Sequence, residues 1–291
     1  MPQELPPISS LTTEQLIAKE SGLASYSGDD RVVYASDLKK KYDDEPKRAY
    51  SFPTGMRRLD EAIGNIETGE LIAIGGPTKN GKTTLCQTWT ANMGRAGHRC
   101  LWFSFEVPMR QFIQQIGAMG GIGRDFDFCA PALLKISDKN WLRDRIIESK
   151  LKHNTRVIFI DNLHHLVDFQ SMRNASLDIG VVIRDLKRMA VELNVAIAVL
   201  CHSTKSAGMG GKAQEVSAAD IRDSSFIPQE ADTTIMVQRK MNEAGIFSNQ
   251  AIVKVCNHRR TAVMDHIIHV VRTSHGLEED EPHYARIPNA G

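Results

Sequence analysis

Residues 76–83 read Gly76-Pro77-Thr78-Lys79-Asn80-Gly81-Lys82-Thr83 and match the pattern G-x-x-x-x-G-K-[ST] in full. The glycines allow a tight turn in which successive backbone N–H groups point at phosphate oxygens. Lys82 supplies a positive charge for the β- and γ-phosphates of a nucleotide, and Thr83 supplies a hydroxyl for Mg²⁺. We therefore expect these eight residues, with Thr84 after them, to bind ATP, and we expect ATP and Mg²⁺ as the cofactors.

Around this loop, short apolar runs alternate with segments of helical periodicity. The apolar runs predict strands at Leu71–Ile74, Cys100–Phe105, Val157–Ile160, Val195–Leu200, Thr233–Val237, Ala251–Val255 and Asp265–Val271. Helices are predicted after Gly81, at Val107–Ala118 and at Ile179–Leu193. This alternation predicts an α/β fold with a mostly parallel central sheet and helices on both faces. The last strands have little helix between them, so antiparallel pairing is expected at that end.

Composition excludes few classes of protein. The formal net charge of the 291 residues is +1, so an anionic partner has to be met by local patches of charge. The five cysteines stand singly, which predicts reduced thiols in a cytoplasmic protein without a zinc site. No stretch has the roughly 18 apolar residues of a membrane span, so no membrane partner is expected.

Residues 1–50 differ from the rest, since they are polar and rich in turn-forming residues. Two short helices are predicted there, near Thr13–Ser21 and at Ala35–Tyr42. We interpret residues 1–50 as an extension or linker that docks on a neighbouring subunit. Residues 51–291 are predicted to form the ATPase domain.

Polar side chains follow three of the predicted parallel strands. Asp161 ends the run Val157–Ile160, which favours a Mg²⁺ ligand, although an Asp there also occurs as a helix cap. Glu106 follows Cys100–Phe105, where a carboxylate can activate the water that attacks the γ-phosphate. Alternatively, Glu106 lies in the first turn of the next helix and is stabilised by the helix dipole. His202 follows the fourth strand and is either a sensor of the γ-phosphate or a structural histidine.

Two further segments carry positive charge. Ser203–Ala219 is rich in glycine and contains Lys205 and Lys212, so it predicts a surface loop that either contacts a nucleic-acid backbone or is merely solvated. Arg259 and Arg260 follow Ala251–Val255. Paired arginines at a strand end are commonly solvated, but in an oligomeric ATPase an arginine can stabilise the transition state in a neighbour's site.

These motifs occur in an order that resembles the C-terminal domain of the DnaB-type replicative helicases, within the RecA-like ATPases. The resemblance runs from about Thr54 to about Val271. Besides the phosphate loop it rests on Thr54-Gly55, Leu59-Asp60, Gly69-Glu70-Leu71, Phe103–Glu106, Ile158–Leu163, Arg184–Val199, Asp220–Ser224 and Gln229–Asp232.

The resemblance implies a RecA-like phosphate-loop NTPase fold and a ring, expected to be a hexamer, that moves on single-stranded DNA during DNA replication, with ATP between subunits. The expected place is the cytoplasm or the DNA-containing compartment of the host cell. It implies Glu106 as the catalytic carboxylate, Arg259 as the arginine that acts in trans, and Arg239 near the nucleotide base. It places the DNA-binding loops at Phe169–Ser176 and Ser203–Ala219, which makes Arg173, Lys205 and Lys212 the candidate DNA contacts.

The sequence departs from this family at four points. His202, Asn257 and Thr261 stand where the family has glutamine, lysine and glycine, and the family's N-terminal helical domain is missing from this sequence. A separate primase or loader is therefore a possible partner. Two alternatives stay open: a RecA-, RadA- or KaiC-like recombinase or regulatory ATPase without unwinding activity, and a binding module that uses nucleotide only to assemble.

Overall fold

The computed structural model describes residues 12, 20–28, 31–43, 50–120, 128–134, 139–166, 175–203, 217–221, 226–241 and 246–285. The chain divides into two compact units, Met1–Lys47 and Arg48–Gly291. In the first unit residues 20–24 are helical, and the predicted second helix is α2, Ala35–Asp43. The helix predicted near Thr13–Ser21 falls mostly outside the described residues.

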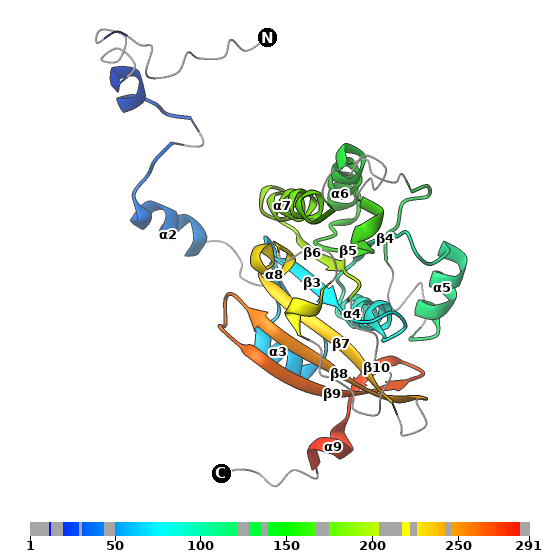
Figure 1. The fold of residues 1–291 in the computed structure, drawn as a ribbon. Coiled ribbons are helices and arrows are strands. Elements are labelled where there is room, and N and C mark those ends of the chain that lie inside the picture. The colour runs from blue at the N-terminus through cyan, green and yellow to red at the C-terminus, as the bar shows by residue number, and fades with distance from the viewer. Residues whose placement is uncertain are drawn as a thin grey trace. The chain divides into compact units, whose positions relative to one another are not determined.

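The second unit is built on a sheet that has eight strands in the described residues, in the order β10-β9-β8-β7-β3-β6-β5-β4 (Figure 1). The strands are β3 Leu71–Gly75, β4 Cys100–Ser104, β5 Val157–Asp161, β6 Ala196–Leu200, β7 Thr233–Met241, β8 Phe247–His258, β9 Met264–Thr273 and β10 Gly276–Glu279. β7, β3, β6, β5 and β4 pair in parallel, whereas β8, β9 and β10 pair antiparallel. Both the mostly parallel sheet and its antiparallel end are therefore confirmed.

Helices cover both faces of the sheet. They are α3 Arg57–Ile63, α4 Lys82–Arg95, α5 Met109–Gly117, α6 Lys139–His153, α7 Ala175–Leu193, α8 Phe226–Glu230 and α9 Glu281–Ala285, with 3₁₀ turns at Leu163–Leu166 and Ala218–Asp220. A two-residue antiparallel pair, β1 Ser51–Phe52 and β2 Ile66–Glu67, flanks α3. Side chains of β3 alternate between two cores: Ile72 and Ile74 pack with α3, α4 and α5, whereas Leu71 and Ala73 pack with α6 and α7.

Where an element was predicted, it differs from the observed one mainly in length. α5 begins at Met109 rather than Val107, because Pro108 disfavours helical dihedrals at the residue before it. β8 and β9 extend well beyond their apolar centres, since their exposed outer residues still pair through the backbone. α6, like α3, α8 and α9, has no counterpart among the predicted helices, and Leu142 and Ile146 are the buried apolar residues described on α6.

Candidate active site

The phosphate loop joins the carboxyl end of β3 to α4, where positive φ angles turn the chain sharply. Gly76 has φ 146°, and a Cβ on it would lie 2.3 Å from the carbonyl oxygen of Val237, so only glycine fits there. Asn80 fixes the loop to β7, since its Oδ1 accepts a hydrogen bond from the Arg239 backbone N–H at 2.8 Å. Its Nδ2 donates to the Thr78 carbonyl at 3.1 Å. The loop is thus held in shape by its own chain.

Lys82 lies at the start of α4 and is buried within this loop. Its Nζ donates to the carbonyl oxygens of Gly76 at 2.9 Å and Pro77 at 3.1 Å. Burial lowers the pKa of the Lys82 ammonium, while Asp161 and Glu106 oppose that change. The lysine is therefore held over the loop by two carbonyl oxygens, and phosphate oxygens are stronger acceptors of its hydrogen bonds.

Thr83 and Asp161 form the candidate metal site. The Thr83 Oγ1 hydroxyl donates to Asp161 Oδ2 at 2.8 Å, which joins the first turn of α4 to the end of β5. A hydroxyl and a carboxylate oxygen are hard ligands of the kind Mg²⁺ takes, alongside waters and substrate phosphates. The residues present therefore fit Mg²⁺ rather than a metal that prefers nitrogen or sulfur ligands.

Burial raises the pKa of the Asp161 carboxyl from 3.8 to about 6, and the nearby Glu106 carboxylate also raises it. The folded chain keeps this proton up to about pH 6, whereas the unfolded chain loses it near pH 4. The folded state therefore binds more protons between these values, and stability falls as the pH rises through them.

Asp161→Asn removes this titration. We expect the variant without nucleotide to match the wild type near pH 4 and to exceed its unfolding free energy at pH 8 by about 3 kcal/mol, the equivalent of a two-unit shift. Urea denaturation at both pH values measures the difference. If the two proteins differed in unfolding free energy by the same amount at pH 4 and at pH 8, the raised pKa of Asp161 would be contradicted.

Glu106, Asn162 and His202 meet beyond the carboxyl ends of β4, β5 and β6. Asn162 Nδ2 donates to Glu106 Oε2 at 2.8 Å and lies 2.9 Å from His202 Nε2. The His202 Nε2 to Glu106 Oε2 distance is 3.7 Å. The structure thus brings together Glu106 and His202, which the sequence singled out, through Asn162, which it did not. The only sequence signal for Asn162 is a second polar residue after Asp161.

A cavity of about 650 Å³ lies beside Glu106 and His202, and its size is that of a nucleotide site. Its lining includes loop residues Thr78 to Thr84, with Glu106, His202 and Arg239. The Arg239 guanidinium lies 4.9 Å from the Phe247 ring centroid and donates to the Ser248 carbonyl. The late strands add lining residues that no sequence pattern marked: Asn249, Ala251, Arg272, Thr273, Ser274, Gly276 and Leu277.

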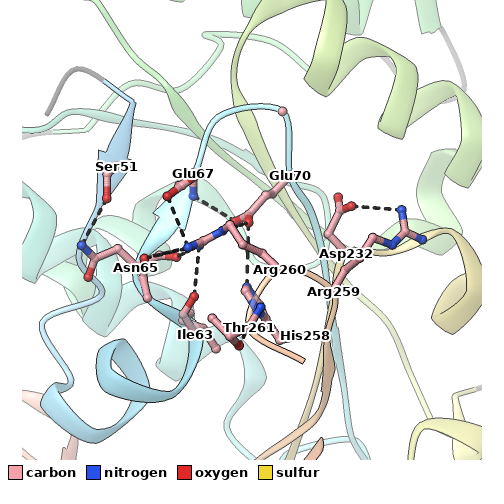
Figure 2. A network of polar contacts seen from close by, with 12 residues as sticks. Ser51, Ile63, Asn65, Glu67, Glu70, Asp232, His258, Arg259, Arg260 and Thr261 are labelled. Carbon is pink, nitrogen blue, oxygen red and sulfur yellow. Dashed lines mark hydrogen bonds and ion pairs between the residues drawn. The ribbon is translucent and has the colours of Figure 1, made fainter. Parts of the chain in front are cut away.

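Arg259 and Arg260, at the turn between β8 and β9, point in different directions (Figure 2). Arg259 Nη1 lies 3.3 Å from Asp232 Oδ1, and its side chain is 58% exposed. Arg260 Nη2 donates to the carbonyl oxygens of Ile63 at 3.0 Å and Asn65 at 2.8 Å. Among the described residues, neither arginine lines the cavity of its own chain.

Arg260 fastens this turn to the end of α3, since it also forms ion pairs with Glu67 and Glu70. We expect Arg260→Ala to lower the free energy of unfolding by about 3 kcal/mol, because the carbonyls at the end of α3 and the Glu70 carboxylate lose a charged donor. Arg259→Ala serves as the matched control and should cost at most about 1 kcal/mol, as is typical of an exposed ion pair. Urea denaturation compares the two. Equal losses of unfolding free energy in the two variants would contradict this role of Arg260.

The candidate DNA contacts Arg173, Lys205 and Lys212 lie outside the described residues. Across the residues that the structure does describe, no helix is long and apolar enough to cross a membrane.

Comparisons with known proteins agree with this fold. Residues 133–273 match the family model of the DnaB-like helicase C terminal domain. A probable plasmid replicative DNA helicase of Chlamydia trachomatis serovar L2 is 25% identical over 248 residues, which cover 75% of this chain and 52% of that protein. The replicative DNA helicase DnaB of Treponema pallidum is 26% identical over 217 residues, which cover 65% of this chain and 48% of that protein. The chain thus spans about half the length of these relatives.

Solved structures show the same fold at low identity. One structure, described as an ATPase domain, matches with a TM-score of 0.68 and 17% identity, over 84% of this chain and 96% of that one. The structure of a DnaB-like replicative helicase, described with its interactions with primase, matches with a TM-score of 0.70 and 16% identity. The match covers 91% of this chain and 71% of that one. This chain therefore combines a RecA-like sheet and a phosphate loop with a segment, residues 133–273, that is similar to the DnaB-like helicase C terminal domain.

Proposed function

We propose that this chain hydrolyses ATP and uses the energy to move along single-stranded DNA as a helicase of DNA replication. The observation that carries the proposal is one cavity at the carboxyl edge of the sheet, where Lys82, Thr83 and Glu106 meet beside buried Asp161. These are the parts that phosphoryl transfer requires: a charged phosphate clamp, a metal site and a group that activates water.

Each residue has a distinct part in hydrolysis. Backbone N–H groups of the loop and the Lys82 ammonium bind the β- and γ-phosphates. Thr83 and Asp161 would hold Mg²⁺, which would neutralise charge on the phosphates. Glu106 accepts a proton from the attacking water, and His202 detects the γ-phosphate from the end of β6. Arg239 lies on the cavity wall toward the nucleotide base.

The proposed assembly is a hexameric ring with ATP between subunits. Arg259 is exposed and does not line the cavity of its own chain, which supports a role in the site of a second copy. Residues 1–50 dock on the neighbouring subunit, and 51–291 form the motor domain. DNA contacts come from Arg173, Lys205 and Lys212. The relatives are replication helicases, and one solved relative is described with its interactions with primase, which supports a separate primase or loader as partner.

A forked DNA duplex with single-stranded tails tests the proposal. With ATP and Mg²⁺ the chain should separate the strands, and Lys82→Ala should abolish both hydrolysis and separation. ATP hydrolysis without strand separation would overturn the helicase and leave an ATPase. Electron microscopy of the same mixture distinguishes closed rings, expected here, from the extended filaments of a recombinase.

A further inference from the structure

Asn162 is buried between two groups of the site, and its amide makes three contacts. It is 3% exposed, and it directly follows β5. Its Oδ1 accepts from the His164 backbone N–H at 3.1 Å, while its Nδ2 lies 2.8 Å from Glu106 Oε2 and 2.9 Å from His202 Nε2. A single NH₂ group thus faces both the carboxylate and the imidazole.

The backbone contact settles which way the amide points. A main-chain N–H can only donate, so the amide atom that faces the His164 N–H has to be the oxygen. This contact is the usual one of an Asn at a helix start, because a 3₁₀ turn begins at Leu163. The NH₂ group therefore has to point toward Glu106 and His202.

The orientation of the amide decides the state of the histidine. Asn162 Nδ2 has two hydrogens and no acceptor, so one hydrogen goes to the Glu106 carboxylate and the other to His202 Nε2. His202 Nε2 then has to be the unprotonated ring nitrogen, with the proton on Nδ1. This arrangement keeps Nε2 from donating directly to the Glu106 carboxylate.

We propose that Asn162 is a positioning residue, which holds Glu106 in place to receive the proton of water and holds His202 as its neutral Nδ1–H tautomer. The inference rests on the proposed ATP hydrolysis. The contact uses one carboxylate oxygen, Oε2, and a carboxylate has a second oxygen with which to accept a proton. Because one NH₂ group binds both side chains, a shift of His202 on loss of the γ-phosphate also moves Glu106.

Asn162→Asp separates this role from that of a helix cap. The introduced carboxylate has the same shape and still accepts from the His164 N–H, but it repels Glu106 and no longer donates to His202. We expect kcat for ATP hydrolysis to fall about 10- to 100-fold, with KM for ATP and the Mg²⁺ dependence changed less than about threefold. Asn162→Ala, which adds no charge, should lower kcat to a similar extent.

Asn92→Asp is the matched control. Asn92 Nδ2 donates to the Thr54 carbonyl at 2.9 Å, so this substitution removes a comparable donor at a distance from the cavity. We expect Asn92→Asp to lower the melting temperature and to leave kcat unchanged. Wild-type kcat in both Asn162 variants, with the chain folded, would overturn the proposal and leave the ATPase assignment intact.

Nitrogen NMR of the full chain with ¹⁵N-labelled histidine gives a second, independent readout. His202→Gln identifies the His202 signals among the ten histidines. We expect a proton on Nδ1 in the wild type and on Nε2 in Asn162→Asp. A wild-type proton on Nε2 would overturn the proposal even if the variants failed to fold. If the wild type hydrolyses no ATP, the proposed function fails. The NMR result still shows whether Asn162 donates to His202 Nε2.

Discussion

Glu106→Gln is expected to lower kcat for ATP hydrolysis by about 10²- to 10⁴-fold, which is the usual contribution of a positioned general base. Glutamine keeps the shape of the side chain, and its amide oxygen can still accept from Asn162 Nδ2. It cannot take a proton from water. The affinity for ATP should change little, because Lys82 and the loop N–H groups bind the phosphates. Steady-state hydrolysis and binding of a fluorescent ATP analogue measure the two effects.

Glu192→Gln is a suitable control for this substitution. Glu192 on α7 is 43% exposed, close to the 44% of Glu106, and it pairs with Arg143 outside the cavity. The control should retain wild-type kcat. If Glu106→Gln also retained it, Glu106 would not be the base, and the view of this chain as a motor would weaken in favour of a module that binds nucleotide only to assemble.

The placement of the site groups at one edge of the sheet was predictable from sequence. Once the apolar runs predict parallel strands, their carboxyl ends have to meet at a common edge. Glu106, Asp161 and His202 each follow such a run, and the structure brings them together there. Helices on both faces were predictable for the same reason, since a fully apolar parallel strand has to be covered on two sides.

The contacts between neighbouring side chains were not predictable in this way. The sequence singled out the pair Arg259 and Arg260, but only the register of the β8–β9 turn shows that Arg260 is bound to α3 while Arg259 is exposed. Asn162 was missed because its role depends on which end of its amide meets a backbone N–H. Arg272 reaches the cavity from β9 through antiparallel pairing that no motif records.

Arg259→Ala is expected to lower kcat of the assembled protein by about 10³-fold, within the range for arginines that act on a neighbour's phosphates. The ion pair between Arg259 and Asp232 does not prevent the arginine from contacting a neighbouring subunit. The Arg259 side chain is 58% exposed, and breaking an exposed ion pair costs at most about 1 kcal/mol. Folding and ATP binding by each chain should be preserved. Arg184→Ala, which removes another exposed arginine with an ion pair, is the control and should retain kcat.

Mixing two inactive variants distinguishes action on a neighbour from action within one chain. Chains with Arg259→Ala keep Glu106, and chains with Glu106→Gln keep Arg259. In a mixed assembly some interfaces join the intact Glu106 of one chain to the intact Arg259 of the next, so hydrolysis should return in part. If Arg259 served its own chain, no chain in the mixture would hold both groups, and activity would stay absent. Recovered activity would thus make the phosphate loop of each chain one half of a site shared by two subunits.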